Sequence, residues 1–269
     1  MGAYARKCAD KDVFLKCLAD IESVLKNYLQ LESEKISYFS TTSVVDFASP
    51  SRFLEPEPRT RYNQYINQFD SNAHIDVITF NYTSTLEHLL DFNGEEKLLN
   101  RFTSIRSIFH LHGTLDNMMV MGVNDASQIK NVIIRSDEDV VEEFIKPEFN
   151  DACLNTKNAI CESLIQNADI IVLFGTSLGL SDDKWWKLIG KRMSSAKYPL
   201  LVYLPYDAQK NPVAEPNHLR RWTRGYVREI KNKFGIELDD EILASRICVA
   251  INKQLFPLTR NRIDAGHTK

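Results

Sequence analysis

The chain has 269 residues, of which 43% are hydrophobic and 26% are charged, with a formal net charge of −3. These values are typical of a soluble globular protein with one sizeable core, and they give no global reason to expect a nucleic-acid partner. The five cysteines form no C-x-x-C pair, which argues against a disulfide framework and a thiolate zinc site. We find neither a signal peptide nor the run of about 18 apolar residues of a membrane span, so we expect a reduced, cytoplasmic protein without a membrane partner.

The first part of the chain is predicted to be helical and then irregular. Apolar residues spaced by three and four within 10–33 indicate an amphipathic helix that packs one face. Over 36–60 this period is lost, and the words Ser-Pro and Pro-Glu-Pro favour a surface connection, followed by a short helix at 61–69. We therefore expect residues 1–56 to add helical and irregular structure beside a larger core.

The next segment predicts half of a βαβ unit. Residues 75–80 form a compact run rich in β-branched residues, typical of a buried strand, which ends at Asn81. The capping-box pattern Ser84-x-x-Glu87 then begins a helix. Further short strands are expected at 107–111 and 118–121.

The carboxy-terminal half alternates helices and strands. Residues 132–149 are expected to be partly helical until Pro147 interrupts them. A helix capped by Asn155 or Thr156 leads into the apolar run 170–174, which predicts a central strand buried on both faces. The cap residues Ser181-Asp182-Asp183 are expected to begin a helix that holds the tryptophan pair. The later predicted elements are a strand at 199–204, a basic helix at 215–233, a last strand at 247–251 and a tail at 256–269.

Repeated alternation of this kind predicts a doubly wound α/β fold with a mostly parallel sheet, forming one domain over 1–269. In such a sheet the carboxyl ends of the strands meet at one edge, where ligands bind. Three polar clusters stand at predicted strand ends: Asn81-Tyr82-Thr83, His112-Gly113-Thr114 and Gly175-Thr176-Ser177-Leu178. The sequence therefore predicts a site in one crevice.

Several sequence motifs around these clusters resemble those of a known protein family. The chain resembles the AbiH family of bacteriophage abortive-infection proteins over about residues 57–255. The motifs that carry this resemblance are, in chain order, TFNYTSTLE, HLHGTLD, MGVND, IKPEFN and GTSLGLSDDKWW. That family is in turn similar, more distantly, to the sirtuin-like, Rossmann-type nucleotide-binding fold of bacterial defence enzymes that hydrolyse NAD. The resemblance implies a phage-defence protein that binds NAD or a related nucleotide.

The resemblance also implies roles for particular residues. Asn81 would lie beside the nicotinamide ribose and orient it, and His112 would act as general base. The third motif would lie along the dinucleotide, followed by an acidic residue. The residues implied to contact the nucleotide are Thr79, Tyr82, Thr83, Gly113, Gly175, Thr176, Ser177, Leu178 and Asp182.

The chain departs from the family pattern in two places. Thr83 stands where sirtuin-like enzymes commonly carry an acidic residue. AbiH-like chains usually open with an apolar strand and a Gly-Asn-Gly-Phe-Asp turn, whereas this chain has no glycine between Gly2 and Gly94. Glycine permits the close backbone approach that a pyrophosphate needs. We therefore expect a truncated member whose sheet lacks its first strand and whose pocket lacks one wall.

The residue types fit NAD cleavage, which needs a base and a polar side chain that orients the sugar. Histidine titrates near neutral pH, so His112 can serve as that base. Taken alone, however, Asn81 could equally satisfy backbone groups in a turn, and His112 could pack at a strand end. His110 could support His112 or be a half-buried strand residue.

Other chemistries are less favoured by the same residues. His110, His112 and Asp116 could supply two imidazoles and a carboxylate, but no further histidine or cysteine is spaced to close the site, so no metal is predicted. Ser177 lacks the proven context of a nucleophile elbow, and hydrogen bonding to a ligand is the favoured role. The tryptophan pair that follows is expected to fill the core rather than to stack on a base.

The predicted basic helix leaves a further possibility. Within 217–233 it carries many arginines and lysines but one acid, Glu229. Such a face more commonly pairs with acids elsewhere than with phosphates, so nucleic acid is not the expected partner. The leading hypothesis is nucleotide binding with cleavage after a phage-derived trigger. The alternatives are a non-catalytic nucleotide-sensing or partner-binding module and a nucleic-acid-directed toxin, and the oligomeric state is left open.

Overall fold

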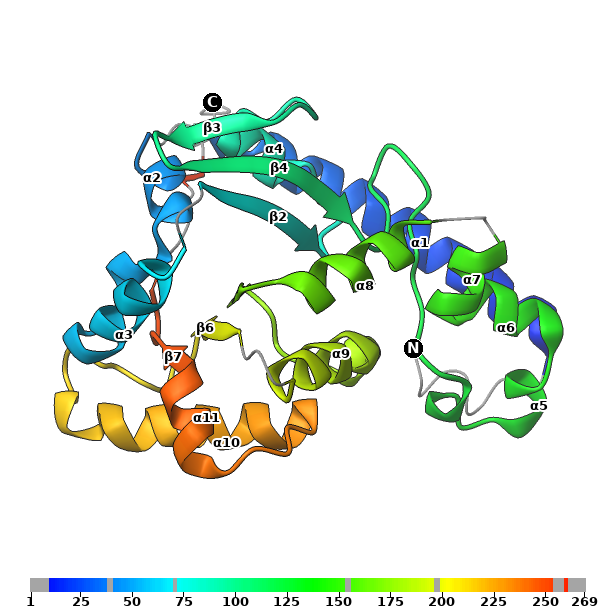
Figure 1. The fold of residues 1–269 in the computed structure, drawn as a ribbon. Helices are drawn as coiled ribbons and strands as arrows, with labels where there is room; N and C mark the ends of the chain where they lie inside the picture. The colour runs from blue at the N-terminus through cyan, green and yellow to red at the C-terminus, as the bar shows by residue number, and fades with distance from the viewer. Residues whose placement is uncertain are drawn as a thin grey trace, which may run out of the picture.

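The computed structural model describes residues 10–37, 41–69, 72–152, 156–195, 199–253 and 259–260. It is a mixed α/β structure with two three-stranded sheets and one two-stranded pairing (Figure 1). The strands are β1 (Ile36–Ser37), β2 (Ala73–Thr79), β3 (Lys97–Asn100), β4 (Thr103–His110), β5 (Ile170–Phe174), β6 (Leu200–Leu204), β7 (Ile247–Val249) and β8 (Thr259–Arg260).

Helices surround both larger sheets. They are α1 (Lys11–Glu34), α2 (Thr41–Ala48), α3 (Pro56–Ile66), α4 (Thr85–Leu90), α5 (Val132–Arg135), α6 (Glu138–Phe144), α7 (Lys146–Ala152), α8 (Lys157–Asn167), α9 (Asp183–Met193), α10 (Leu219–Phe234) and α11 (Asp240–Arg246). Single 3-10 turns lie at Pro50–Phe53, Ala126–Gln128, Leu180–Asp182 and Pro216–His218.

One sheet contains β5, β6 and β7, all parallel. Every residue of β6 is buried, because its alternate side chains enter two different cores. Leu201 and Tyr203 join α9 and α10 in one core, whereas Val202 joins Tyr62 and Tyr65 of α3 in the other. The strand predicted at 170–174 is confirmed as β5, but its central position was wrong. β5 forms the edge of this sheet, and its alternate residues are exposed.

The other sheet has the order β2-β4-β3. β2 runs parallel to β4 with a register shift between Ile75 and Asp76, and β3 runs antiparallel to β4. Ile78, Phe80 and Phe109 pack against the core of the β5–β7 sheet, so the two sheets share apolar contacts. The carboxyl ends of β2 and β4 lie together, as the parallel pairing requires.

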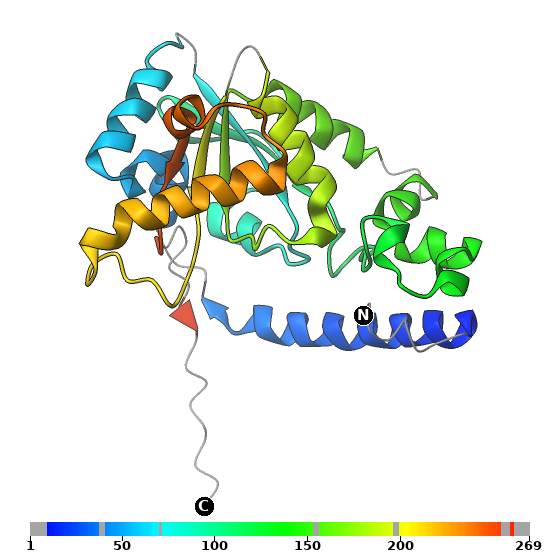
Figure 2. The ribbon, with the colours of Figure 1, turned by 90° about the horizontal axis from the view of Figure 1, so that it is seen from below.

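The long helix α1 begins at Asp10, whose carboxylate accepts hydrogen bonds from the first helical amides. Phe14 and Leu18 are buried, and the Phe14 ring packs edge-on against Phe144 of α6 at 5.1 Å. Figure 2 shows α1 running along one side of the molecule, outside the two sheets. The predicted packed stripe is therefore confirmed only in its first turns, and apolar residues further along, such as Tyr28, are exposed.

Several predicted elements were wrong or incomplete. Residues 36–60 are not irregular throughout, since they contain β1, α2 and the start of α3. Residues 118–121 form no strand, because only the Val120 amide reaches across, to the His112 carbonyl. Pro147 does not interrupt a helix but lies in the first turn of α7, where its missing N–H costs nothing. β3 and α11 were not predicted, and most of the predicted tail lies outside the described residues.

The α/β class is thus confirmed, with strands that are mostly parallel. The described strands form two hydrogen-bonded sheets, and their union in one doubly wound sheet stays a prediction. Across the described ranges, no helix combines the length and apolarity needed to span a bilayer.

Candidate functional site

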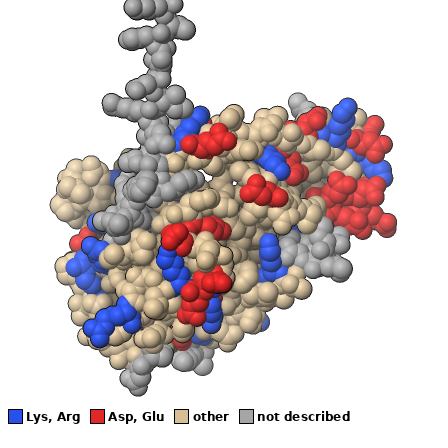
Figure 3. All heavy atoms as spheres, turned by 90° about the horizontal axis from the view of Figure 1, so that it is seen from above, with Lys and Arg blue, Asp and Glu red and all other residues tan. Residues whose placement is uncertain are grey.

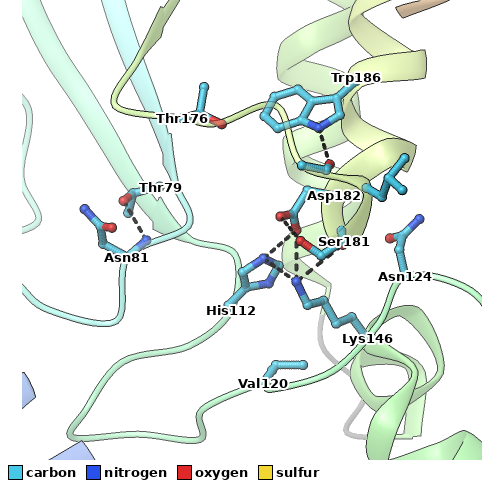
Figure 4. Close-up of polar contacts among 12 residues, drawn as sticks. Thr79, Asn81, His112, Val120, Asn124, Lys146, Thr176, Ser181, Asp182 and Trp186 are labelled. Carbon is cyan, nitrogen blue, oxygen red and sulfur yellow. Dashed lines mark hydrogen bonds and ion pairs between the residues drawn. The ribbon is translucent and has the colours of Figure 1, made fainter. Parts of the chain in front are cut away.

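Three polar side chains from separate segments meet beyond the end of β4 (Figure 4). His112 follows β4, Asp182 ends the 3-10 turn before α9, and Lys146 is the first residue of α7. Because these segments are far apart in sequence, only the tertiary fold brings them together. We call them the His112–Lys146–Asp182 cluster.

The carboxylate of Asp182 is the centre of this cluster. Its Oδ1 atom lies 2.9 Å from His112 Nε2 and 3.0 Å from Lys146 Nζ. Its Oδ2 atom accepts a hydrogen bond of 2.8 Å from the Ser181 hydroxyl. His112 is 5% exposed and Lys146 is 8% exposed. Since a buried charge is costly unless it is paired, Lys146 and Asp182 depend on each other.

The hydrogen bonds of Asp182 define the tautomer of His112. A carboxylate only accepts, so the Nε2 atom of His112 carries the proton and donates it to Asp182. The ammonium of Lys146, 3.2 Å from Nε2, then bonds to Asp182 rather than to the ring. The Nδ1 atom of His112 is buried and has no hydrogen-bond partner among the described residues. A carboxylate that holds one ring nitrogen and leaves the other with a free lone pair is the arrangement of a general base.

The cluster also perturbs its own titration. Burial lowers the pKa of His112 below the ordinary 6.5; the hydrogen bond to Asp182 opposes this shift, and the charge of Lys146 adds to it. Burial by itself would raise the pKa of Asp182, but the hydrogen bond from His112 and the charge of Lys146 outweigh it and lower that pKa. At neutral pH the cluster therefore holds a neutral imidazole, a carboxylate and an ammonium.

Aromatic rings surround the imidazole. The Phe80 and Tyr82 rings lie 5.3 Å and 6.5 Å from the His112 ring, measured between centroids. The Tyr82 hydroxyl donates to the Val120 carbonyl, and burial raises the pKa of Tyr82 to about 12, so it stays neutral. These rings make the surroundings of His112 less polar, which strengthens the electrostatic effects of its neighbours.

His110 has a different environment and a different charge. Its Nδ1 atom lies 2.7 Å from the Asn81 carbonyl oxygen, and its Nε2 atom lies 2.5 Å from a carboxylate oxygen of Glu87. Both partners are acceptors, so His110 is an imidazolium that donates on both sides. Burial lowers the pKa of His110, but the hydrogen bonds to Glu87 and Asn81 outweigh it and raise that pKa.

Glu87 also corrects a sequence prediction. Ser84 stands at the N-cap of α4 without a side-chain capping bond, so the predicted capping box does not form. Glu87 instead bonds to His110, which holds the loop after β2 through the backbone of Asn81. Helix α4 thus places the negative charge of Glu87 beside the carboxyl ends of β2 and β4.

The Asn81 side chain does not join the cluster. Asn81 is exposed, its amide N–H donates to the Thr79 hydroxyl at 3.1 Å, and its side chain points away from His112 in Figure 4. The Thr83 hydroxyl is engaged with that of Thr85 at 2.9 Å. The structure thus places Asn81 and His112 on neighbouring strand ends without a contact between their side chains.

The third motif forms the loop after β5. Gly175 has a φ of +65°, and a Cβ added there would meet no atom within 4 Å, so its backbone is open to close approach. The Thr176 hydroxyl accepts from the Leu178 amide at 3.2 Å. Leu178 is buried with a φ of 51°, a left-handed conformation that costs a non-glycine residue about 1–2 kcal/mol. Of this predicted group, Asp182 alone enters the cluster.

Gly113 performs a different task in the loop after β4. It has a φ of +76°, and an added Cβ would lie 1.5 Å from the Met118 carbonyl oxygen. Only glycine allows the chain to turn and pass so close there. Gly113 therefore positions His112 by backbone geometry.

A small pocket borders the cluster. It has a volume of about 10 Å³, room for about one water molecule, and is lined by His112, Lys146 and Lys184, with Asn124, Asn158 and Trp185 among the other walls. Pockets for small molecules usually have about 300–1,000 Å³, so this one is below that range. A larger pocket, of about 330 Å³, lies between α3 and the β3–β4 turn and contains none of the predicted site residues.

The remaining alternatives are resolved in part. The tryptophans after the third motif, Trp185 and Trp186, are buried, and the Trp186 indole donates to the Gly179 carbonyl at 2.8 Å, which confirms the core prediction. Within the described ranges, no group of three or more His, Cys, Asp or Glu side chains is placed to hold a metal ion. His110 and His112 instead bond to separate carboxylates.

Lys146 is the site residue that sequence reasoning missed. It belongs to IKPEFN, one of the sequence motifs that carry the family resemblance, and it precedes a proline at the start of a helix. That context was the available signal. Its pairing with Asp182 could not be read from the sequence, because the two residues lie in elements with no local relationship.

Comparison with known proteins identifies the family. No curated protein and no solved structure matches the chain. A family model described as "Bacteriophage abortive infection AbiH" matches residues 8–203, which is more than half of the 269 residues and includes the whole cluster. This match begins and ends earlier in the chain than the resemblance inferred from the motifs, which covered about residues 57–255. The chain belongs to the AbiH family of bacteriophage abortive infection proteins.

Proposed function

We propose that this protein acts in phage defence by binding NAD or a related nucleotide in the cytoplasm and cleaving it in response to a phage-derived trigger. Membership of the AbiH family supports the defence role. The likeness of the strand-end motifs to sirtuin-like enzymes supports the nucleotide. The parallel pairing within both sheets is compatible with a doubly wound, sirtuin-like arrangement.

The observation that carries the proposal is the state of His112. Its Nε2–H is held by Asp182, and its Nδ1 lone pair has no partner among the residues that the structure describes. In the proposed reaction, Nδ1 takes a proton from water while the water oxygen bonds to the ribose C1′. The bond from C1′ to the nicotinamide nitrogen breaks, and its electron pair leaves with neutral nicotinamide. The products are nicotinamide, ADP-ribose and one proton.

Other residues would bind rather than react. Gly175 leaves its backbone open to a pyrophosphate. Lys146 and Lys184 line the pocket and would reach a phosphate only in competition with their carboxylate partners Asp182 and Glu162. Asn81 would reach the ribose from the end of β2. A dinucleotide far exceeds the pocket of about 10 Å³, so it would extend along the strand ends beyond His112.

The test is nicotinamide release from NAD, measured by chromatography. His112→Gln is the informative variant, because the glutamine amide can still donate to Asp182 but cannot act as a base. His74→Gln, at the opposite end of β2, is the matched control. We expect release by the unchanged protein and by His74→Gln, and none by His112→Gln. NAD left intact by the unchanged protein, both alone and with lysate from phage-infected cells, would refute cleavage.

A second candidate is a nucleotide sensor without catalysis. The small pocket and the 5% exposure of His112 favour it, because both restrict entry to the base. Calorimetry with NAD and ADP-ribose discriminates between the two functions. Heat of binding without nicotinamide release supports the sensor, whereas release supports the enzyme.

A further inference from the structure

Helix α10 exposes a row of four arginines: Arg220, Arg221, Arg224 and Arg228. We call them the arginine row. Spacings of four residues place three of them along one side of the helix, and Arg221 widens that side. From Arg220 to Arg228 the row spans about 12 Å, at about 1.5 Å per residue.

The lysines of the same helix differ from the arginines. Lys231 pairs with Asp240 at 2.5 Å, and Lys233 pairs with Glu229 at 2.9 Å. None of the four guanidinium groups has a hydrogen bond or ion pair within the part of the chain that is described. Arg228 still contributes to lowering the pKa of Asp240, after the larger effects of Lys231. Pairing with acids, the ordinary explanation for a basic helix, therefore accounts for the lysines but not for the arginine row.

The orientation of α10 keeps the row at the surface. Tyr226, Ile230 and Phe234 are buried and pack against the β5–β7 sheet, so the helix cannot rotate its arginines inward. α10 lies on the underside of the molecule and is in front in Figure 2. The opposite face, shown in Figure 3, mixes basic and acidic side chains. The four arginines thus form an exposed basic surface on α10, while the neighbouring α11 carries the exposed acids Asp240 and Glu241.

We propose that the arginine row binds the sugar–phosphate backbone of a nucleic acid. Guanidinium groups bind phosphate oxygens in a bidentate manner and are charged at every physiological pH. Phosphate charges on one DNA strand are spaced by about 3.4 Å when projected on the helix axis, so a row of about 12 Å lying parallel to that axis matches the rise of three or four of them. A membrane surface fits less well, because the apolar side of α10 is already packed in the core and cannot insert into lipid.

The experiment measures binding of fluorescent single-stranded RNA and double-stranded DNA by anisotropy, between about 50 and 200 mM salt. The full chain is compared with Arg220→Gln/Arg224→Gln and with Lys231→Gln/Lys233→Gln, which removes the same charge from the same helix. Each phosphate contact contributes about 0.7 to 0.9 to the slope of log affinity against log salt. We therefore expect the arginine variant to lose about 1.4 to 1.8 from that slope, whereas the lysine variant keeps it.

The remaining outcomes are equally decisive. Arg220→Lys/Arg224→Lys keeps both charges and should keep most of the slope. Whichever of RNA and DNA binds more tightly identifies the natural backbone. Equal losses in the arginine and lysine variants, absence of binding to both nucleic acids, or binding only to anionic phospholipid vesicles would overturn the proposal. Nicotinamide release should be unchanged in Arg220→Gln/Arg224→Gln, so this test is separate from that of the cleavage.

Discussion

Replacing Lys146 with methionine tests how the buried cluster balances its charge. The substitution keeps the length of the side chain and removes an ammonium that lies 3.0 Å from the Asp182 carboxylate and 3.2 Å from His112 Nε2. Asp182 then remains as a buried carboxylate whose only cationic neighbour can come from protonation of His112. The stability of the variant should therefore depend on pH in a way that the unchanged protein does not share.

The magnitude follows from burial. Removing one partner of a buried ion pair usually costs about 3–5 kcal/mol. The side chains of Lys146 and Asp182 keep 10% and 17% exposure, so we expect the lower end, about 3 kcal/mol, at about pH 8, where His112 is neutral. Burial and the charge of Lys146 both lower the pKa of His112. Without Lys146 that pKa rises, and a protonated His112 restores the charge beside Asp182 at low pH.

The direction of the pH effect is thus defined. In the unchanged protein, the lowered pKa of His112 removes stability as pH falls below 6.5, because protonation of the folded state is disfavoured. In the variant that pKa is lowered less, so less stability is lost on acidification and the cost of the substitution shrinks as pH falls. A tenfold change in the proton affinity of the imidazole corresponds to about 1.4 kcal/mol, so we expect the cost of the substitution to fall to about half at about pH 5.5.

Urea unfolding at both pH values, followed by circular dichroism, gives the free energies of unfolding. Asp182→Asn is the control with the opposite sign. It leaves the Lys146 ammonium beside His112, so protonation of His112 brings no relief and the loss should not shrink at low pH. An equal cost of Lys146→Met at the two pH values would refute the proposed exchange of charge between Lys146 and His112.

The other predictions concern the segments that support the cluster. Glu87→Gln should lower the free energy of unfolding by about 2 kcal/mol at about pH 6 and by less at high pH. The raised pKa of His110 contributes stability that is complete below pH 6.5 and is lost as pH rises through the folded-state pKa. If urea unfolding shows a cost that grows with pH, the prediction is wrong. Gly113→Ala should lower the melting temperature far more than Gly175→Ala, because the added methyl group meets the Met118 carbonyl only at Gly113. Both glycines have positive φ, so each loses about 1–2 kcal/mol to backbone strain, and similar melting temperatures would exclude the clash.

The local sequence pattern was sufficient to predict those helices and strands whose own residues determine their type and their ends. The apolar run at 170–174 is short, β-branched and bounded by polar residues, and it became β5 because such a run is too short for a helix and pairs through its backbone as a strand. α10 ends at Gly235, which adopts the left-handed conformation that terminates a helix. The polar clusters after β2, β4 and β5 were likewise visible, since each follows an apolar run directly.

Tertiary structure decided how those pieces are used. Met118 to Met121 resemble a strand, yet no neighbouring strand among the described residues pairs with them. Ser84 and Glu87 have capping-box spacing, but a charged histidine on β4 binds Glu87 more strongly than a backbone amide would. The sequence by itself determined the α/β class, the family motifs and His112 as a reactive type of residue. Only the fold brought Lys146 and Asp182 to that histidine, because the cost of burying a charge depends on which partners surround it in space.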